Sequence, residues 1–222
     1  MIEESARTGI VQKDKETVAL IPEIKFGMLT PDDLEKLAAV SRKYAIPAIK
    51  ITSAQRIALV GVKPEHVESI WEELGMEPGH GLGTGLNYVQ ACPGTSVCRL
   101  GQRDSIGMAE RIYEVIKPLG IESKIKIGVS GCPLQCGEGA IRDVGVFGKS
   151  STGWTVQIGG NSGLNARVGE VLAKDLDDDA LIDTVTKLMV YYKENMKTKE
   201  RMYRFVPRMG GVEAIKTAIG LV

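Results

Sequence analysis

In the first 44 residues, the spacing of apolar and polar positions changes from the period of a strand to that of a helix. The apolar stretch 18–26 predicts a strand, which Pro22 would interrupt at a sheet edge or a bulge. Thr30, Pro31 and two aspartates then form a helix start, and helical spacing continues to about Tyr44. The predicted buried stripe of this helix consists of Leu34, Leu37, Ala38 and Ser41.

Residues 48–62 are rich in β-branched side chains and predict one strand, which Lys63 and Pro64 end. A second helix follows, because Val67, Ile70, Trp71 and Leu74 fall on one helical face. An order of strand, helix, strand and helix in a segment of this size predicts an α/β half-domain of ferredoxin-like type.

The second part of the chain shows the same alternation with longer helices. Asp104 predicts the N-cap of a helix that runs to about Lys117, and residues 124–130 alternate as a strand. Residues 143–148 and 153–160 predict a hairpin. The remaining predictions are a helix from Asp177 to Asp179 onward, with a stripe of Leu181, Val185, Leu188, Met189 and Tyr192, then a basic tail over 197–211 and a short helix over 212–219. The predicted fold class is α+β, a half-domain followed by an α/β domain.

A glycine-rich stretch over 75–87 separates the two parts and is either a linker or a loop whose backbone approaches a ligand. We therefore predict domains at 1–80 and 81–222. The run GHGLGTG does not follow a strand, so it is no dinucleotide-binding fingerprint. His80 within it is a lone loop histidine and carries no function by itself.

Composition narrows the classes of function. Hydrophobic residues make up 43% of the chain and charged residues 25%, which is typical of a globular protein. The formal net charge is zero, so no overall field would recruit nucleic acid or an anionic membrane. The first residues, MIEESARTG, do not resemble a signal peptide, and no apolar run has the length of a membrane span. We expect a cytoplasmic protein.

All four cysteines lie between Cys92 and Cys136, in the patterns C-x5-C and C-x3-C. Each pair lies in a loop that contains glycine and proline. In a reducing compartment, two cysteine pairs favour a metal site over disulfides, and thiolates suit iron–sulfur clusters and zinc. Structural zinc fits less well because its cysteine pairs are usually closer in sequence. Unligated cysteines remain the third alternative.

The flanking residues extend these motifs. The segments CPGTSVCRLGQRDS and KIKIGVSGCPLQCGEGAIRDVGVFG resemble the sirohaem and [4Fe-4S] domain of the nitrite/sulfite reductase family. The similarity runs from about Ala91 to Asp177 and weakly into KERMYRF, and residues 48–62 resemble the preceding ferredoxin-like half-domain. Small assimilatory-type sulfite reductases and the large subunit of NADH-dependent nitrite reductase are the most similar members. The chain would hold one of the two repeats of the full-size family.

The resemblance implies two cofactors, sirohaem and a [4Fe-4S] cluster. Cys92, Cys98, Cys132 and Cys136 would bind the cluster, and the thiolate of Cys136 would also bind the sirohaem iron. Three arginines near the cysteines are candidates for the sirohaem carboxylates, namely Arg99, Arg103 and Arg142.

The resemblance also implies an oxyanion site. Lys124 and Lys126 are two residues apart on a strand and therefore share a face. In the family, such a pair faces the substrate or the haem carboxylates, whereas the alternative is a half-exposed strand with its polar side out. Arg56 follows Gln55 on the predicted 48–62 strand. Many family members have arginine at the position of Ala54, and Arg56 would share that face and reach the same pocket.

The implied function is a small oxidoreductase that reduces sulfite to sulfide, or nitrite to ammonia. Without a flavin or NAD segment, electrons would come from an external donor such as a ferredoxin-like protein. A single repeat leaves one side of the haem to be covered, for which a homodimer is one arrangement. The rival interpretations are a non-catalytic iron–sulfur electron-transfer protein, a tetrapyrrole carrier and a structural zinc module.

Overall fold

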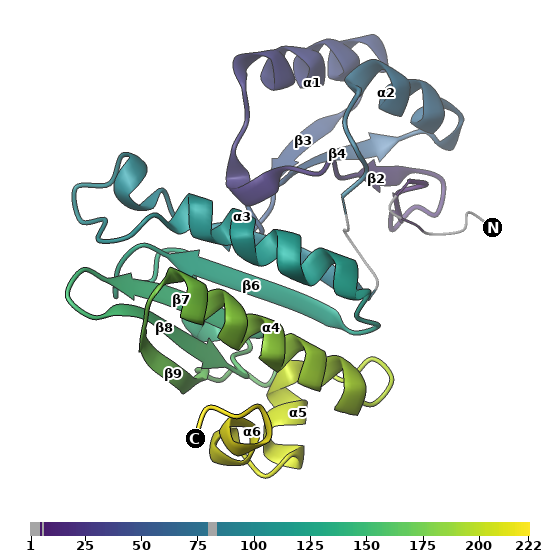
Figure 1. Cartoon of the computed structure of the whole chain (residues 1–222). Helices are drawn as coiled ribbons and strands as arrows, with labels where there is room; N and C mark the ends of the chain where they lie inside the picture. The colour runs from purple at the N-terminus through teal and green to yellow at the C-terminus, as the bar shows by residue number, and fades with distance from the viewer. Residues whose placement is uncertain (1–4, 6, 80–83) are drawn as a thin grey trace. The chain divides into compact units, whose positions relative to one another are not determined.

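The structure is a computed structural model that describes residues 5, 7–79 and 84–222. The chain forms two compact units, Met1–Gly83 and Thr84–Val222. The sequence-predicted boundary near residue 80 and His80 lie outside the described residues. Figure 1 shows the elements of each unit along the colour gradient from the N- to the C-terminus.

The first unit is an antiparallel sheet with two helices on one face. The strands lie in the order β1-β2-β4-β3. Side chains of β2, β4 and both helices form its core, which includes Leu20, Leu59, Ile70 and Trp71. The elements are β1 (Ile10–Val11), β2 (Val18–Leu20), α1 (Pro31–Lys43), β3 (Ala48–Ile51), β4 (Ile57–Val62) and α2 (Val67–Leu74), with 3-10 turns at Lys25–Gly27 and Pro64–His66.

Both predicted helices of this unit are confirmed. The hydroxyl of Thr30 accepts a hydrogen bond from Asp33 N–H, and the Asp33 carboxylate accepts one from Thr30 N–H at 2.9 Å, which forms a capping box. All four predicted side chains of α2 are buried. In α1, however, Leu34 is 51% exposed and Val40 takes its place in the core.

Two strand predictions in this unit were wrong. The strand predicted over 18–26 ends at Leu20, and Pro22 lies in an isolated bridge with Pro78 instead of interrupting a strand. Residues 48–62 form two antiparallel strands rather than one, because the chain turns between Thr52 and Arg56. Gln55 within this turn has a φ of 56°. Arg56 therefore directly precedes β4 instead of lying within a continuous strand.

The second unit is a mixed sheet in the order β5-β6-β7-β8-β9. Strands β5, β6 and β7 are parallel, and β8 and β9 are antiparallel to their neighbours. Helices α3 and α4 lie side by side, α3 on β5 and β6 and α4 on β8 and β9 (Figure 1). The elements are β5 (Gly85–Ala91), α3 (Ser105–Ile116), β6 (Lys124–Ser130), β7 (Val144–Lys149), β8 (Gly153–Ile158), β9 (Glu170–Leu176), α4 (Asp178–Asn195), α5 (Met202–Arg208) and α6 (Val212–Ala218), with 3-10 turns at Gly94–Ser96, Lys117–Leu119 and Gly139–Ile141.

The structure confirms the caps at Asp104 and Asp177, strand β6, the β7–β8 hairpin and the whole predicted stripe of α4. Strand β9 was not predicted, because most of its side chains are exposed and its apolar residues do not alternate with polar ones. The basic tail contains helix α5, whose Met202, Phe205 and Val206 are buried. Both sheets and their helices confirm the α+β class. In the described parts of the chain, no helix is long and apolar enough to cross a membrane.

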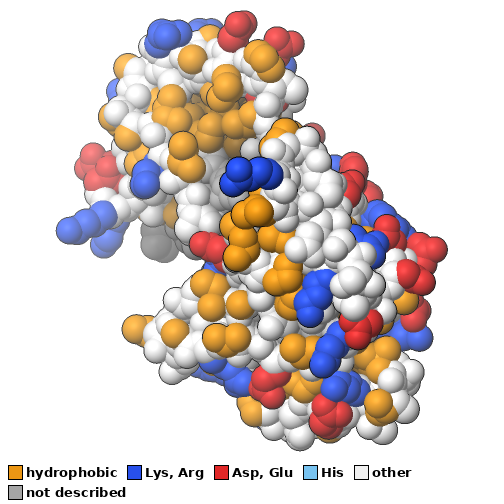
Figure 2. Space-filling view, turned by 90° about the vertical axis from the view of Figure 1, so that its left-hand side faces the viewer, with side chains coloured by type: hydrophobic (Ala, Val, Ile, Leu, Met, Phe, Trp, Pro, Cys, Tyr) orange, Lys and Arg blue, Asp and Glu red, His pale blue; other side chains and the backbone are white. Residues whose placement is uncertain are grey.

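On the face that Figure 2 shows, side chains of both charges are present. In the space-filling view, basic and acidic side chains are interspersed, with hydrophobic side chains between them (Figure 2). Local clusters rather than one extended field must therefore provide any anion site.

Candidate functional site

The two cysteine loops meet at one edge of the second unit's sheet. Cys92 directly follows β5, and Gly131 and Cys132 directly follow β6, the parallel neighbour of β5. Neighbouring parallel strands end at the same edge, so the loops lie together. The N–H of Cys92 donates to the carbonyl of Val129 at 3.1 Å, and the N–H of Gly131 donates to Cys92 Sγ at 3.2 Å.

Glycines allow these loops to pack backbone against backbone. A Cβ atom at Gly131 would lie 2.5 Å from the Arg103 carbonyl oxygen and 2.8 Å from Gly94 Cα. Gly101 is similarly close to Gly94, at 2.5 Å from its carbonyl oxygen. The Gly131 carbonyl in turn accepts from the N–H groups of Gln102 and Arg103, both at 2.9 Å. Any side chain at these glycines would push the loops apart.

The second cysteine loop is also the crossover from β6 to β7. Such a connection between parallel strands usually contains an α-helix, but here it is the loop of Cys132 and Cys136 with one 3-10 turn. A Cβ at Gly128 would meet the Gly137 carbonyl oxygen, and a Cβ at Gly145 would meet that of Gly139. The crossover therefore lies directly on glycines of β6 and β7.

The side chains of β6 alternate about this crossover. Ile125, Ile127 and Val129 are completely buried, whereas Lys124 and Lys126 are partly exposed. Because side chains two apart share a face, both lysines lie on the face of Gly128, which the crossover covers. The predicted common face of Lys124 and Lys126 is confirmed, and it is also the face of the second cysteine loop.

The thiols differ in exposure. Cys92 and Cys132 are buried, Cys98 and Cys136 are exposed, and all four are free. Within residues 5, 7–79 and 84–222, no three side chains of His, Cys, Asp or Glu are arranged to hold a single metal ion. The residues fit a thiolate-ligated cluster in two respects, namely a donor set of four thiols on adjoining loops and a backbone N–H already directed at Cys92 Sγ.

The lysine face carries further cations and an aromatic ring. Tyr88 is the partner of Lys126 across the β5–β6 ladder. Lys126 Nζ lies 5.8 Å from the centre of the Tyr88 ring, and Arg142 Cζ lies 5.7 Å from it. Both distances are in the range of cation–π contacts. Tyr88 therefore brings together two residues that the sequence analysis had identified separately.

The environment of Lys126 destabilises its positive charge. Partial burial lowers the pKa of Lys126, and the neighbouring cations Arg201, Lys124 and Arg142 lower it further. Asp143 acts in the opposite direction. A bound anion would stabilise the charged form of such an amine. Because its pKa is lowered, the amine also gives up a proton more readily than an exposed lysine does.

The three arginines near the cysteines lie in different environments. Arg142 is 5% exposed and is bonded to Glu138, Ser162 and Gln90, while the described residues provide no hydrogen-bond partner for its Nε. Arg103 donates to the Lys149 carbonyl at 3.1 Å and lies 3.8 Å from Asp178. Arg99 is exposed in the first cysteine loop. Arg56 is buried, but it belongs to the first unit.

The sequence analysis missed three residues of this region, namely Tyr88, Asp143 and Arg201. Asp143 is completely buried and is bonded both to Arg201 and to the backbone of Lys126. No local pattern indicates these contacts, since Arg201 is 58 residues from Asp143. The RDVGVFG stretch and the basic tail supplied the residue types but not their pairing.

Family comparisons cover nearly the whole chain. Residues 83–220 match the family model described as the nitrite and sulphite reductase 4Fe-4S domain. Residues 10–77 match the nitrite/sulfite reductase ferredoxin-like half domain. The two matches together confirm the predicted order of a ferredoxin-like half-domain followed by the cluster-binding domain.

Individual relatives give the same assignment. The chain is 46% identical over 211 residues to an assimilatory-type sulfite reductase of Nitratidesulfovibrio vulgaris, covering 95% of this chain and 96% of that protein. It is 36% identical over 200 residues to a nitrite reductase [NAD(P)H] of Bacillus subtilis, covering 90% of this chain but 25% of that protein. The chain therefore spans nearly the whole length of the first relative and about a quarter of the length of the second.

A solved structure shares the fold. The crystal structure of dissimilatory sulfite reductase I superimposes with a TM-score of 0.76 at 16% sequence identity, over 92% of this chain and 68% of that one. At this identity the likeness concerns the fold alone. The chain belongs to the nitrite and sulfite reductase family.

Proposed function

We propose that this protein is a small reductase that converts sulfite to sulfide with sirohaem and a [4Fe-4S] cluster, and that nitrite is its alternative substrate. The observation that carries the proposal is the shared sheet face of the lysine pair and the second cysteine loop. The similarity to a sulfite reductase of nearly the same length supports sulfite rather than nitrite as the main substrate. The nitrite reductases that match are much longer proteins.

The cofactors would be held by the two cysteine loops. Cys92, Cys98, Cys132 and Cys136 would bind the cluster, with Cys136 shared with the sirohaem iron. The resemblance assigns the shared role to Cys136, and its side chain, like that of Cys98, is exposed and therefore accessible to a second group. When bound, the two groups would pass on electrons from the donor protein and provide the iron that binds the anion.

The basic face would hold the anion and the haem carboxylates. Lys124 and Lys126 would bind the oxyanion, and the buried surroundings of Lys126 would strengthen this attraction. Reduction of sulfite to hydrogen sulfide takes up six electrons and eight protons and releases three waters, so groups that release protons are needed. Lys126 can do so because its pKa is lowered.

The arginines would contribute unequally. Arg99 is exposed beside Cys98 and is available to a haem carboxylate. Arg142 would act from its buried position beside Tyr88. Arg103 is already engaged by Lys149 and Asp178, so we expect it to contribute least. Arg56 would reach the anion from the first unit.

The electron donor would be a separate protein, for which a ferredoxin-like protein is our proposal.

Reconstitution of the purified protein with iron, sulfide and sirohaem tests the proposal. We expect haem and cluster absorption, and viologen-dependent consumption of sulfite that exceeds that of nitrite. Cys136→Ser should lose both sets of absorption bands. Uptake of cluster without sirohaem by the unaltered protein would instead favour an electron-transfer role, and binding of zinc alone would favour a structural module.

The double variant Lys124→Gln/Lys126→Gln tests the basic face separately. It should keep both cofactors and lose sulfite affinity by about a hundredfold, roughly tenfold for each charge removed. The matched control is Lys187→Gln, which removes an exposed lysine paired with Asp183 on α4. Unchanged sulfite affinity in the double variant would contradict the proposed anion site.

A further inference from the structure

The strand segment that carries Lys126 is held by a buried acid and a distant arginine. Asp143 is completely buried, and its Oδ2 accepts from Lys126 N–H at 2.9 Å. Arg201 donates to both carboxylate oxygens, from Nε at 3.0 Å and from Nη2 at 2.8 Å. The β6–β7 ladder begins at the pair of Ile127 and Val144, so the carboxylate of Asp143 satisfies the backbone donor just outside it.

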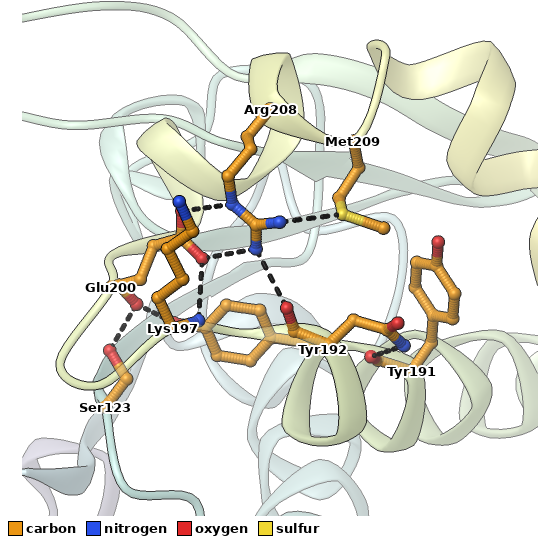
Figure 3. A network of polar contacts seen from close by, with 8 residues as sticks. Ser123, Tyr191, Tyr192, Lys197, Glu200, Arg208 and Met209 are labelled. Atoms are coloured by element: carbon orange, nitrogen blue, oxygen red, sulfur yellow. Dashed lines mark hydrogen bonds and ion pairs between the residues drawn. The ribbon is translucent and has the colours of Figure 1, made fainter.

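Glu200, next to Arg201, holds the other end of the same segment. Its carbonyl accepts from the hydroxyl of Ser123 at 2.5 Å and from the Tyr192 hydroxyl (Figure 3). Its carboxylate is in turn bonded to Arg208, at 2.7 Å from Nε and 2.6 Å from Nη2. Ser123 and Lys126 enclose the start of β6, so the dipeptide of Glu200 and Arg201 holds both ends of the segment 123–126, which carries the lysine pair.

The same contacts fix the charges around the Lys126 amine. The charged groups that face it are the cations Arg201, Lys124 and Arg142 and the anion Asp143, together with the ring of Tyr88. A buried carboxylate and a partly buried guanidinium compensate each other only while both are present. Loss of either partner would leave an uncompensated charge next to Lys126.

We propose that Asp143 and Arg201 are positioning residues for Lys126, which hold its strand segment and balance the charges around its amine, so that the C-terminal segment helps to build the oxyanion site. This proposal rests on the proposed anion-binding function of Lys124 and Lys126. It assigns a role to Asp143, the last residue of the crossover before β7, and to Arg201 of the C-terminal segment, neither of which contacts a cysteine in any of the contacts above. It also explains why an arginine, which binds a carboxylate through two parallel hydrogen bonds, is used at residue 201.

Titration of the lysine amines by NMR tests the proposal without any cofactor. In the full-length protein with isotope-labelled lysine, Arg201→Gln should raise the pKa of Lys126 by roughly one unit, because a cation is lost and Asp143 remains. Asp143→Asn should lower it by a similar amount, because an anion is lost and Arg201 remains. Arg204→Gln is the matched control, since Arg204 is exposed in the first turn of α5, the helix that Arg201 directly precedes, and its side chain lies on the Tyr203 ring.

The direction of the Asp143→Asn shift separates positioning from a merely structural role. Simple loosening of the fold would move Lys126 towards the ordinary lysine value in both variants, and that result would overturn the proposal. If Asp143→Asn does not fold, Arg201→Lys replaces it. That variant keeps the cation but loses the two parallel hydrogen bonds, so the pKa of Lys126 should rise clearly less than in Arg201→Gln, whereas an equal rise would again contradict the proposal.

The outcome for the proposed function is read from a different experiment. If the amine shifts are as expected but the loaded Lys124→Gln/Lys126→Gln variant binds sulfite normally, the anion site fails while the positioning role stands. If the anion site is verified and the NMR shifts are absent, the positioning role fails alone.

Discussion

At the scale of single residues, chemistry could be read from the sequence where it is encoded locally. The cysteine spacing and the alternation of Lys124 and Lys126 depend only on neighbours along the chain, and the structure places both lysines on one face. Tyr88, Asp143 and Arg201 could not be found in this way. Their roles arise from pairing across a ladder or across 58 residues, which no local pattern records.

The lowered pKa of Lys126 predicts the pH dependence of sulfite binding. The amine is charged below its folded-state pKa and neutral above it, and this pKa lies below the usual 10.5. We therefore expect sulfite affinity to fall as the pH rises through that value, before exposed lysines lose their charge. Titration of sulfite into the loaded protein between pH 7 and 10 measures this. In the Lys126→Gln variant the same alkaline loss should be absent.

The same shift predicts a gain in stability when the charge is removed. Because the folded-state pKa is below that of the unfolded chain, the folded protein binds the proton less well, and protonated Lys126 destabilises it. Lys126→Met should raise the free energy of unfolding of the apoprotein at pH 7 by only a few tenths of a kcal/mol, since solvent screens a half-exposed amine. This gain would be measured as a slightly higher urea midpoint. The gain should vanish as the pH rises from the folded-state pKa towards 10.5. A lower midpoint at pH 7 would show that Lys126 stabilises the fold.

At the scale of elements, helices were predicted better than strands for a physical reason. Helix ends are set by nearby side chains, as at Thr30, Asp104 and Asp177, where each cap bonds a backbone N–H three residues on. The turn that divides residues 48–62 depends instead on a positive φ at Gln55, and glutamine is not a residue type from which a positive φ is predicted. In strand β9, three consecutive apolar residues, Val171 to Ala173, precede Lys174 and Asp175, so the strand shows no alternating period.

The glycine crossover gives a prediction at this scale. A methyl group at Gly128 would collide with the backbone of Gly137, which cannot rotate away as a side chain can. Gly128→Ala should therefore destabilise the protein by about 2–3 kcal/mol and reduce cluster uptake. Urea denaturation of the apoprotein measures the first effect and iron content after reconstitution the second. Gly163→Ala is the control, because its nearest atoms belong to the Asn161 side chain at 3.5 Å. Equal stability of the two variants would refute the close packing of the crossover.

At the scale of the whole molecule, each unit has its own core and one of the two tryptophans. Trp71 is 4% exposed in the first unit, and Trp154 is 1% exposed in the second. All four cysteines and both lysines belong to the second unit, whereas Arg56 belongs to the first. From the glycine-rich stretch, the sequence predicts domains at 1–80 and 81–222, and this boundary lies outside the described residues.

The tryptophans allow the two units to be observed separately. Trp71→Phe leaves Trp154 to report the second unit, and Trp154→Phe leaves Trp71 to report the first. In urea, we expect the first unit to unfold at the lower concentration, because a smaller unit buries a smaller share of its surface. Loading with cluster and sirohaem should stabilise the second unit, which Trp154 reports. At a free ligand concentration of a hundred times Kd, its free energy of unfolding should rise by about 2.7 kcal/mol. Sulfite added to the loaded protein should then raise the Trp71 transition as well, provided that Arg56 binds the anion. Arg56→Gln should abolish the shift of the Trp71 transition and leave the shift of the Trp154 transition unchanged. If sulfite does not shift the Trp71 transition in the protein that retains Arg56, then Arg56 does not bind the anion.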